Sequence, residues 1–278
     1  INIFVLHPNN RISPVQRKLM TTSNEKNVFN IAVKGSFDDC QNIVKAMFVD
    51  QVFANEIKMS GVNSINWARI IAQSVYYFYS YFLVKNNNEP INFSVPTGNF
   101  GDVYAGYLAK KIGLPINKFI VATNQNDILH RAITNGAYNV ENVSETISPS
   151  MDIQIASNFE RLIFDLNNHS DKKTIEVMRG IKENGKYEIQ KEFLDRINVD
   201  FLSSRMDENE VLSTIKSVYE KFDKVLDPHS AIGYGAFDKV DLKGNNIVLA
   251  TAHPCKFPDA IEKAINIKAE LPTELAFI

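Results

Sequence analysis

The chain has 278 residues, 45% of them hydrophobic and 22% charged, and its formal net charge at pH 7 is −2. This composition is typical of a soluble globular protein with one large domain or two modest ones. The small net charge gives no electrostatic argument for binding nucleic acid or an anionic membrane.

The cysteines and the most apolar stretch narrow the class of protein further. Cys40 and Cys255 lie far apart and lack metal-ligand spacing. We therefore expect small buried side chains in a reducing, cytoplasmic compartment, with no disulfide framework and no metal site.

The stretch from Trp67 to Val84 contains Arg69, which favours a buried helix over a membrane span. The chain begins with Ile1 in a strand-like run, so the pattern predicts that the true amino terminus lies upstream. Whether that upstream part contains a targeting segment is left open.

The first part of the chain predicts alternating strands and helices. Apolar runs predict strands over Ile3 to Leu6 and Val28 to Val33, and helical spacing predicts helices over Pro14 to Thr21 and Phe37 to Val49. This β-α-β-α order indicates a small α/β layer structure.

A long helix is predicted from Asn63 to Leu83, because apolar residues recur there at steps of three and four. We expect that stripe to be core; it consists of Ile65, Ala68, Ala72, Val75, Tyr79 and Phe82. The polar linker Lys85 to Pro90 follows. We therefore predict a small domain over residues 1–84, incomplete at its amino terminus, and a second domain over residues 85–278.

The second domain is predicted to contain a βαβ unit. A strand over Ile91 to Val95, a helix over Val103 to Ile112 and a strand over Lys118 to Thr123 imply parallel pairing with a right-handed crossover. Residues 141–209 have weak periodicity, and we interpret them as a variable insertion with short helices.

Two helices and a strand are predicted to close the chain. A capping box over Asp207 to Glu210 opens a helix to about Leu226, Asp227-Pro228 opens another to about Val240, and Asn246 to Thr251 forms the last strand. The predicted fold class is α/β.

The loop between the first strand and helix of the βαβ unit is the most informative motif. It reads Pro96-Thr97-Gly98-Asn99-Phe100-Gly101-Asp102, and a glycine-containing turn before a helix presents N–H groups to an anion. A P-loop needs Lys and Ser/Thr after its last glycine, whereas Asp102 follows Gly101 here. The spacing of Gly98, Gly101 and Gly106 does not match a dinucleotide fingerprint. A short loop with one amide side chain, Asn99, suits a single phosphate monoester, and an ordinary turn is the alternative.

Three further polar clusters lie at the ends of predicted elements. They are the segments from Asn63 to Arg69, from Asp227 to Ala231 and from Thr251 to Phe257. The first suits a carboxylate or phosphate because Asn63, Asn66 and Arg69 would share one helix face. Each cluster also has a purely structural alternative. For the first it is a capping asparagine with a solvated Arg69, for the second a helix cap with a structural His229, and for the third an ordinary strand exit.

In this order the clusters resemble the threonine synthase family, which uses pyridoxal phosphate and has fold type II, the tryptophan-synthase-β-like architecture. The matching segments are Arg11 to Gln16, Asn63 to Ile70, Pro96 to Asp102 with Ala105-Gly106-Tyr107, Asp227-Pro228-His229, and Thr251 to Pro254 with Lys256-Phe257. The resemblance implies a parallel-sheet large domain, a smaller inserted α/β domain and a cofactor between them.

The resemblance also assigns residues. Gly98, Asn99, Phe100 and Gly101 would hold the cofactor phosphate, and Thr251 would face the pyridine nitrogen. The candidates for substrate binding, listed together, are Ser64, Asn66, Arg69, His229 and Lys256.

The family converts O-phospho-L-homoserine and water into L-threonine and phosphate. Its Schiff-base lysine lies upstream of the small domain, so the resemblance implies that this chain alone is not a competent catalyst and that its partner is the missing amino-terminal segment. The alternatives are another fold type II lyase, a threonine-synthase-like protein that binds pyridoxal phosphate or a phosphorylated ligand without turnover and, more distantly, a nucleotide-binding oxidoreductase.

Overall fold

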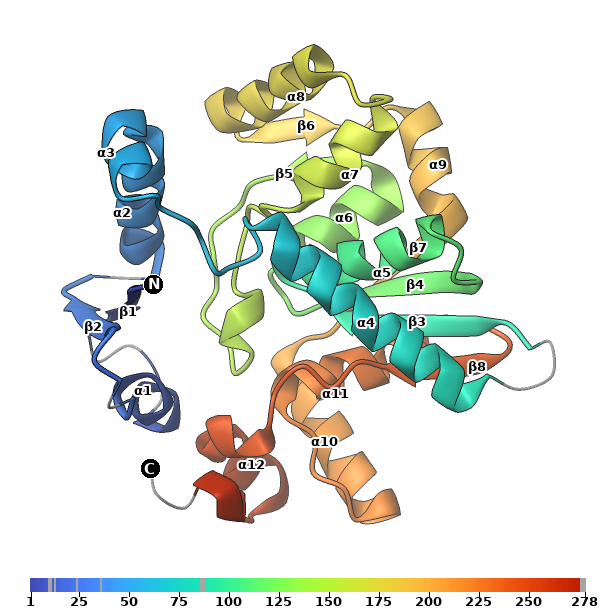
Figure 1. Cartoon of the computed structure of the whole chain (residues 1–278). Coiled ribbons are helices and arrows are strands. Elements are labelled where there is room, and N and C mark those ends of the chain that lie inside the picture. Colours follow the sequence, from blue (N-terminus) through green and yellow to red (C-terminus); the bar gives the residue numbers. More distant parts are fainter. Residues whose placement is uncertain (10–11, 13, 24, 36, 86–88, 276–278) are drawn as a thin grey trace.

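The structure is a computed structural model that describes residues 1–9, 12, 14–23, 25–35, 37–85 and 89–275. Its centre is a four-stranded sheet in the order β7-β4-β3-β8, in which all the pairings are parallel. These strands are β3 (Ile91–Pro96), β4 (Ile116–Thr123), β7 (Phe201–Arg205) and β8 (Asn245–Val248). Figure 1 shows this sheet edge-on between two layers of helices.

Helices cover both faces of the sheet, and the strand sequences show why. In β4, Phe119 and Val121 join one buried cluster, whereas Ile120 and Ala122 join another, as expected for a strand with side chains alternating between two covered faces. The first cluster contains residues of α4 (Trp67–Val84), α5 (Gly101–Lys111), α6 (Ile128–Asn135), α7 (Phe159–Leu166), α8 (Asp171–Asn184) and α9 (Lys191–Asp200). The second contains residues of α10 (Glu208–Phe222), α11 (Pro228–Gly235) and α12 (Pro258–Ile265).

A close backbone contact seats α11 on the sheet. The buried Ser94 of β3 donates its hydroxyl to the carbonyl of Gly233 at 2.6 Å. A Cβ at Gly233 would lie only 3.0 Å from Pro96 and Val248, so glycine permits this approach. The contact holds the carboxyl-terminal half of α11 against β3 and β8.

A smaller unit precedes α4 and lies to one side of the sheet layers in Figure 1. It contains β1 (Ile3–Pro8), α1 (Pro14–Thr21), β2 (Val28–Val33), α2 (Phe37–Val49) and α3 (Gln51–Glu56). Strands β1 and β2 form a two-stranded parallel sheet, on which Phe4 and Phe29 stack with their ring centroids 4.9 Å apart and remain 60% and 43% exposed.

The remaining elements are short. Strands β5 (Ala137–Asn139) and β6 (Lys186–Glu188) pair antiparallel. The 3₁₀ turns are η1 (Pro149–Met151), η2 (Phe237–Lys239), η3 (Pro254–Lys256) and η4 (Thr273–Leu275). In the part of the chain that the structure describes, no helix has both the length and the apolar character needed to cross a bilayer.

Most predicted elements are confirmed. The structure contains the β-α-β-α start, the parallel βαβ unit, the predicted short helices within 141–209 and the capping box of Asp207 and Glu210. Both cysteines are buried and free. Arg11 and Ser13, part of the first family motif, lie outside the described residues.

Three predictions were wrong. The long helix begins at Trp67 and not at Asn63, because Asn66 is its N-cap. The expected core stripe is also wrong, because all six of its residues are exposed; Ile65, Val75, Tyr79 and Phe82 are 48%, 60%, 66% and 64% exposed. The buried face of α4 instead carries Ile70, Ser74, Tyr77 and Tyr81. Finally, residues 141–209 are not only an insertion, because β7 pairs with β4 in the main sheet.

The division of the chain into domains stays a prediction. Helix α4 packs against α5, and its buried side chains belong to the cluster on the sheet. This packing favours a division ahead of Trp67 over one at residues 84/85.

The packing of α5 against α4 is close at Gly106 and can be tested there. Gly106→Ala would place a Cβ against the ring of Tyr77 and 2.7 Å from a ring carbon of Phe119, both fully buried. We expect the free energy of unfolding to fall by about 1–3 kcal/mol from overpacking, measured by urea denaturation.

Gly180→Ala is the matched control. A Cβ at Gly180, inside α8, would meet no atom within 4 Å, so the same substitution should raise the free energy of unfolding by up to about 1 kcal/mol through helix propensity. Equal effects of the two substitutions would contradict the packing described for α4 and α5.

Candidate functional site

A cavity of about 650 Å³ opens at the carboxyl ends of β3 and β8. Ligands of open parallel α/β sheets usually bind at this edge. Its wall comes from five segments: residues 64–80 at and within α4, 96–103 after β3, 150–151 in η1, His229 in α11, and 248–252 at the end of β8. The cavity therefore joins segments that lie far apart in the sequence.

The loop Pro96–Asp102 lines this cavity. Among the hydrogen bonds of the described residues, none has the N–H of Gly98, Asn99, Phe100, Gly101 or Asp102 as donor. Successive unpaired N–H groups at the start of a helix form a site for an anion. The amides therefore make this loop a candidate phosphate site.

Phe100 sets the conformation of the loop. It is the residue before α5 and has φ 66° and ψ 5°, in the left-handed region, which is uncommon for a residue with a large side chain. Its ring is 1% exposed and packs against Phe159 and Phe201, at centroid distances of 5.3 and 5.8 Å. Burial of the ring holds the backbone in this turn, and left-handed residues of this kind form anion-binding concavities.

Asn99 is held from outside the loop. Its carbonyl accepts hydrogen bonds from the N–H of Asn158 at 3.0 Å and from the Asn158 side-chain amide at 3.1 Å. Its Oδ1 accepts from the N–H and the hydroxyl of Ser157, both at 3.3 Å. These bonds leave the Asn99 side-chain NH₂ available as a donor to a ligand.

Asp102 is an ionisable group beside the candidate phosphate site. The Tyr77 hydroxyl donates to the Asp102 carbonyl at 2.9 Å and lies 3.3 Å from its carboxylate. Burial raises the pKa of the Asp102 carboxyl from its ordinary 3.8 to about 6, while the Tyr77 hydroxyl and the Arg69 guanidinium oppose the rise. The group is thus neutral in part of the population near pH 6.

Several residues singled out in the sequence meet at the cavity. The loop residues Gly98, Asn99, Phe100 and Gly101 all line it, as do Ser64, Arg69, His229 and Thr251. No lysine is among the described residues that line it.

Two candidate residues lie elsewhere. Asn66 accepts a hydrogen bond from the N–H of Ala68 at 2.9 Å and donates to the carbonyl of Gly61 at 2.8 Å, so its side chain caps α4. Lys256 belongs to η3 and does not line the cavity.

Residues 148–161 were missed by sequence reasoning. Ser150 and Met151 line the cavity, and Ser157 and Asn158 hold Asn99. Arg161 donates to the carbonyls of Ser64 and Ile65 at 3.3 and 3.1 Å, which ties the start of α4 to this segment. All these contacts join residues far apart in the sequence, so they leave no local pattern. The only signal of this segment in the sequence is its high content of polar residues.

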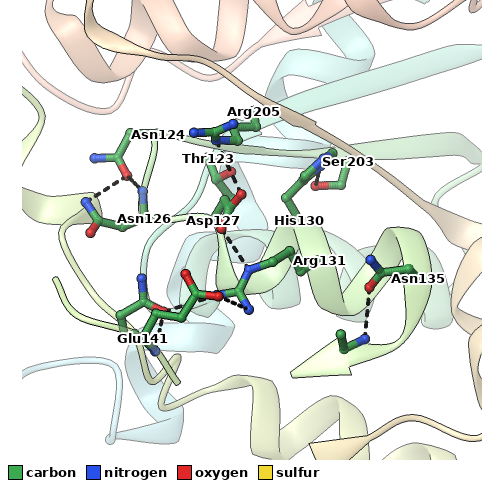
Figure 2. Close-up of polar contacts among 12 residues, drawn as sticks. Thr123, Asn124, Asn126, Asp127, His130, Arg131, Asn135, Glu141, Ser203 and Arg205 are labelled. Carbon is green, nitrogen blue, oxygen red and sulfur yellow. Dashed lines mark hydrogen bonds and ion pairs between the residues drawn. The ribbon is translucent and has the colours of Figure 1, made fainter. Parts of the chain in front are cut away.

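Polar side chains after β4 anchor this missed segment. Figure 2 shows Asn124 bonded to Asn126 near the end of β4. The Asn124 side-chain amide lies 2.9 Å from the hydroxyls of Thr146 and Ser148 and 2.8 Å from the Asp152 carboxylate. The segment is therefore fixed to the sheet before it reaches the cavity.

A second set of contacts in Figure 2 borders this anchor. Arg131 pairs with Asp127 at 2.8 Å and with Glu141 at 3.0 Å, and Arg205 pairs with Asp127 at 3.3 Å. Because these charges neutralise one another and none of them lines the cavity, we interpret them as structural.

Comparison with known proteins finds extensive similarity. The family profile "Threonine synthase, C-terminal" matches residues 230–278. Threonine synthase of Pseudomonas aeruginosa is 46% identical over 99% of this chain and 60% of its own length. The corresponding figures for the Saccharomyces cerevisiae threonine synthase are 44%, 96% and 56%.

A solved threonine synthase structure is similar to this chain as well. The PLP-bound threonine synthase from Brucella melitensis superposes with a TM-score of 0.92 and 48% identity, over 99% of this chain and 59% of its own. The chain thus spans 60% or less of the length of the curated relatives it matches, and its fold is that of the fold type II enzymes.

The pKa of Asp102 generates the second prediction. A folded-state pKa of about 6, against 3.8 unfolded, means that the stability contributed by the neutral carboxyl is complete below about pH 4 and is lost as pH rises through about 6. Asp102→Asn should therefore gain stability relative to the natural chain between pH 4 and 7. The gain should be at most about 3 kcal/mol, and less where solvent reaches the group.

Urea unfolding at each pH measures this gain. Asp241→Asn, which removes an exposed carboxylate, is the matched control. The same pH trend in both variants would show that the environment of Asp102 is not the cause.

Proposed function

We propose that this chain, which is homologous to the threonine synthases over nearly its whole length, forms the phosphate-binding part of an enzyme that converts O-phospho-L-homoserine and water into L-threonine and phosphate. The observation that carries the proposal is the row of unpaired amides from Gly98 to Asp102, which faces a cavity shared with Arg69 and Thr251. This reaction completes the synthesis of threonine.

The cavity suits pyridoxal phosphate as a cofactor. The amides of Gly98 to Gly101 and the free NH₂ of Asn99 are donors for a phosphate monoester. Thr251 lines the same cavity, after β8, and we assign its hydroxyl to the pyridine nitrogen. When bound, the cofactor supplies the electron sink that stabilises negative charge on the substrate carbons.

The substrate carries a carboxylate and a second phosphate, so the site needs cationic and hydroxyl donors besides the loop. Arg69 is an exposed residue on the cavity wall, and Ser64, which precedes α4, lines the same cavity. We assign these two residues to a substrate anion, because a guanidinium binds carboxylate or phosphate through paired hydrogen bonds. Asn66 and Lys256 lack the placement for this role.

We further propose that a separate segment of the same enzyme completes the site. The described cavity wall offers no lysine for a covalent bond to the cofactor. The curated relatives are longer, and helix α4 exposes an apolar row that such a segment would cover, at helical spacing and 42–66% exposed: Trp67, Ile71, Val75, Tyr79 and Phe82. Two free buried cysteines suit a reducing compartment, and we place the enzyme in the cytoplasm.

A chimera tests this proposal. In it, this chain replaces the matched region of the Pseudomonas aeruginosa threonine synthase. We expect the chimera to release phosphate and threonine from O-phospho-L-homoserine, and we expect this chain alone to bind pyridoxal phosphate without turnover. A borohydride-reducible adduct at one specific lysine of this chain, or turnover by the chain alone, would contradict the division of the site. A chimera that binds the cofactor but turns over nothing would favour a non-catalytic binding protein.

Variants of the chimera test the substrate assignment. Arg69→Ala should raise KM for O-phospho-L-homoserine about tenfold with a smaller change in kcat, since it removes binding to an anion present in the ground state. Arg179→Ala, an exposed arginine of α8 away from the cavity, is the control and should leave KM unchanged. An unchanged KM in the first variant would exclude Arg69 from substrate binding.

A further inference from the structure

We propose that His229 is a positioning residue whose imidazole holds the turn Pro149–Met151 against Gly98 and so keeps the phosphate loop in its anion-binding shape. The inference rests on the proposed function, because it takes the loop Pro96–Asp102 as the phosphate site.

The buried Asp227 fixes the proton on His229. The two residues are 1% and 3% exposed, and Oδ1 of Asp227 lies 2.9 Å from Nδ1 of His229. The Asp227 carboxylate also accepts from the backbone N–H groups of His229 and Ser230, at 2.9 and 3.3 Å, as the N-cap of α11. Because a carboxylate in this position only accepts, Nδ1 carries the proton and donates it.

The other ring nitrogen is thereby left as an acceptor. Nε2 of His229 accepts a hydrogen bond from the N–H of Ser150 at 3.3 Å. The ring also packs on Phe257, with the ring centroids 4.9 Å apart. Both ring nitrogens of His229 are thus engaged by groups of this chain. These contacts favour a positioning role over the substrate binding expected from the sequence.

Ser150 in turn bears on the phosphate loop. Its carbonyl oxygen lies so close to Gly98 that a Cβ there would overlap it, and Cα of Met151 would lie 3.4 Å from that Cβ. Ser157 and Asn158 hold the next residue, Asn99, through its side chain and carbonyl. Residues 98 and 99 are thus held on both sides by one segment, while their own N–H groups stay free.

The test compares His229→Ala with His229→Gln in the whole chain. The Oε1 atom of glutamine replaces Nε2 as an acceptor but cannot act as an acid or base at neutral pH. Two quantities are measured: hydrogen exchange at the amide of Ser150, and the dissociation constant for pyridoxal phosphate. His169→Ala, which alters an exposed histidine outside the cavity wall, is the control.

For His229→Ala we expect exchange at Ser150 to accelerate at least tenfold and the dissociation constant to rise five- to tenfold. For His229→Gln we expect both quantities within about twofold of the natural chain. Gly98→Ala, with His229 intact, should also weaken cofactor binding because it displaces Ser150 from the other side, and it tests the contact even if His229→Ala fails to fold.

Each outcome decides between the two proposals. Unchanged exchange and affinity in His229→Ala would overturn the positioning role, and so would a glutamine variant as impaired as the alanine variant. A natural chain that does not bind pyridoxal phosphate would overturn the proposed function, whereas the exchange rate at Ser150 would still report whether His229 holds the turn.

Discussion

The burial of the Phe100 ring is the constraint on which the candidate site depends. Phe159 and Phe201 fix this ring in the core, and the left-handed backbone that results precedes α5 directly. A residue other than glycine in this conformation costs free energy, and the aromatic packing offsets that cost. This turn leaves a row of N–H groups, from Gly98 to Asp102, with no partner in the described chain. In water-accessible cavities such a row is satisfied by solvent or by an anion, and the positive end of the α5 dipole favours the anion.

Local signals in the sequence predicted the parts of the site that depend on local chemistry. The βαβ unit, the glycine-containing loop and the N-cap Asp227 follow from residue types within a few positions of one another. Segment 148–161 could not be predicted in this way, since Ser150, Ser157 and Asn158 act through partners 58–79 residues away in sequence. Strand β7 was hidden because two serines, Ser203 and Ser204, interrupt a run of only five residues.

Helix α4 shows a different limit of sequence reasoning. It is apolar on more than one side, so periodicity identifies a helix without saying which face is buried. In the structure the Tyr77 face packs on the sheet layer, and the row containing Val75 and Tyr79 has no partner among the described residues. The exposed face of β1 and β2, which bears Phe4 and Phe29, is also apolar. Exposed apolar surface of this kind is typical of faces that another protein segment covers.

Binding of a phosphate monoester by the amides of Gly98 to Gly101 can be observed residue by residue with amide-resolved NMR. The ¹⁵N-labelled chain is titrated with pyridoxal phosphate and, separately, with inorganic phosphate. We expect these four amides to shift together, to saturate with one dissociation constant for each ligand, and to shift more than the amides of exposed lysines. Shifts confined to surface lysines, or a linear response without saturation in the loop, would contradict this binding.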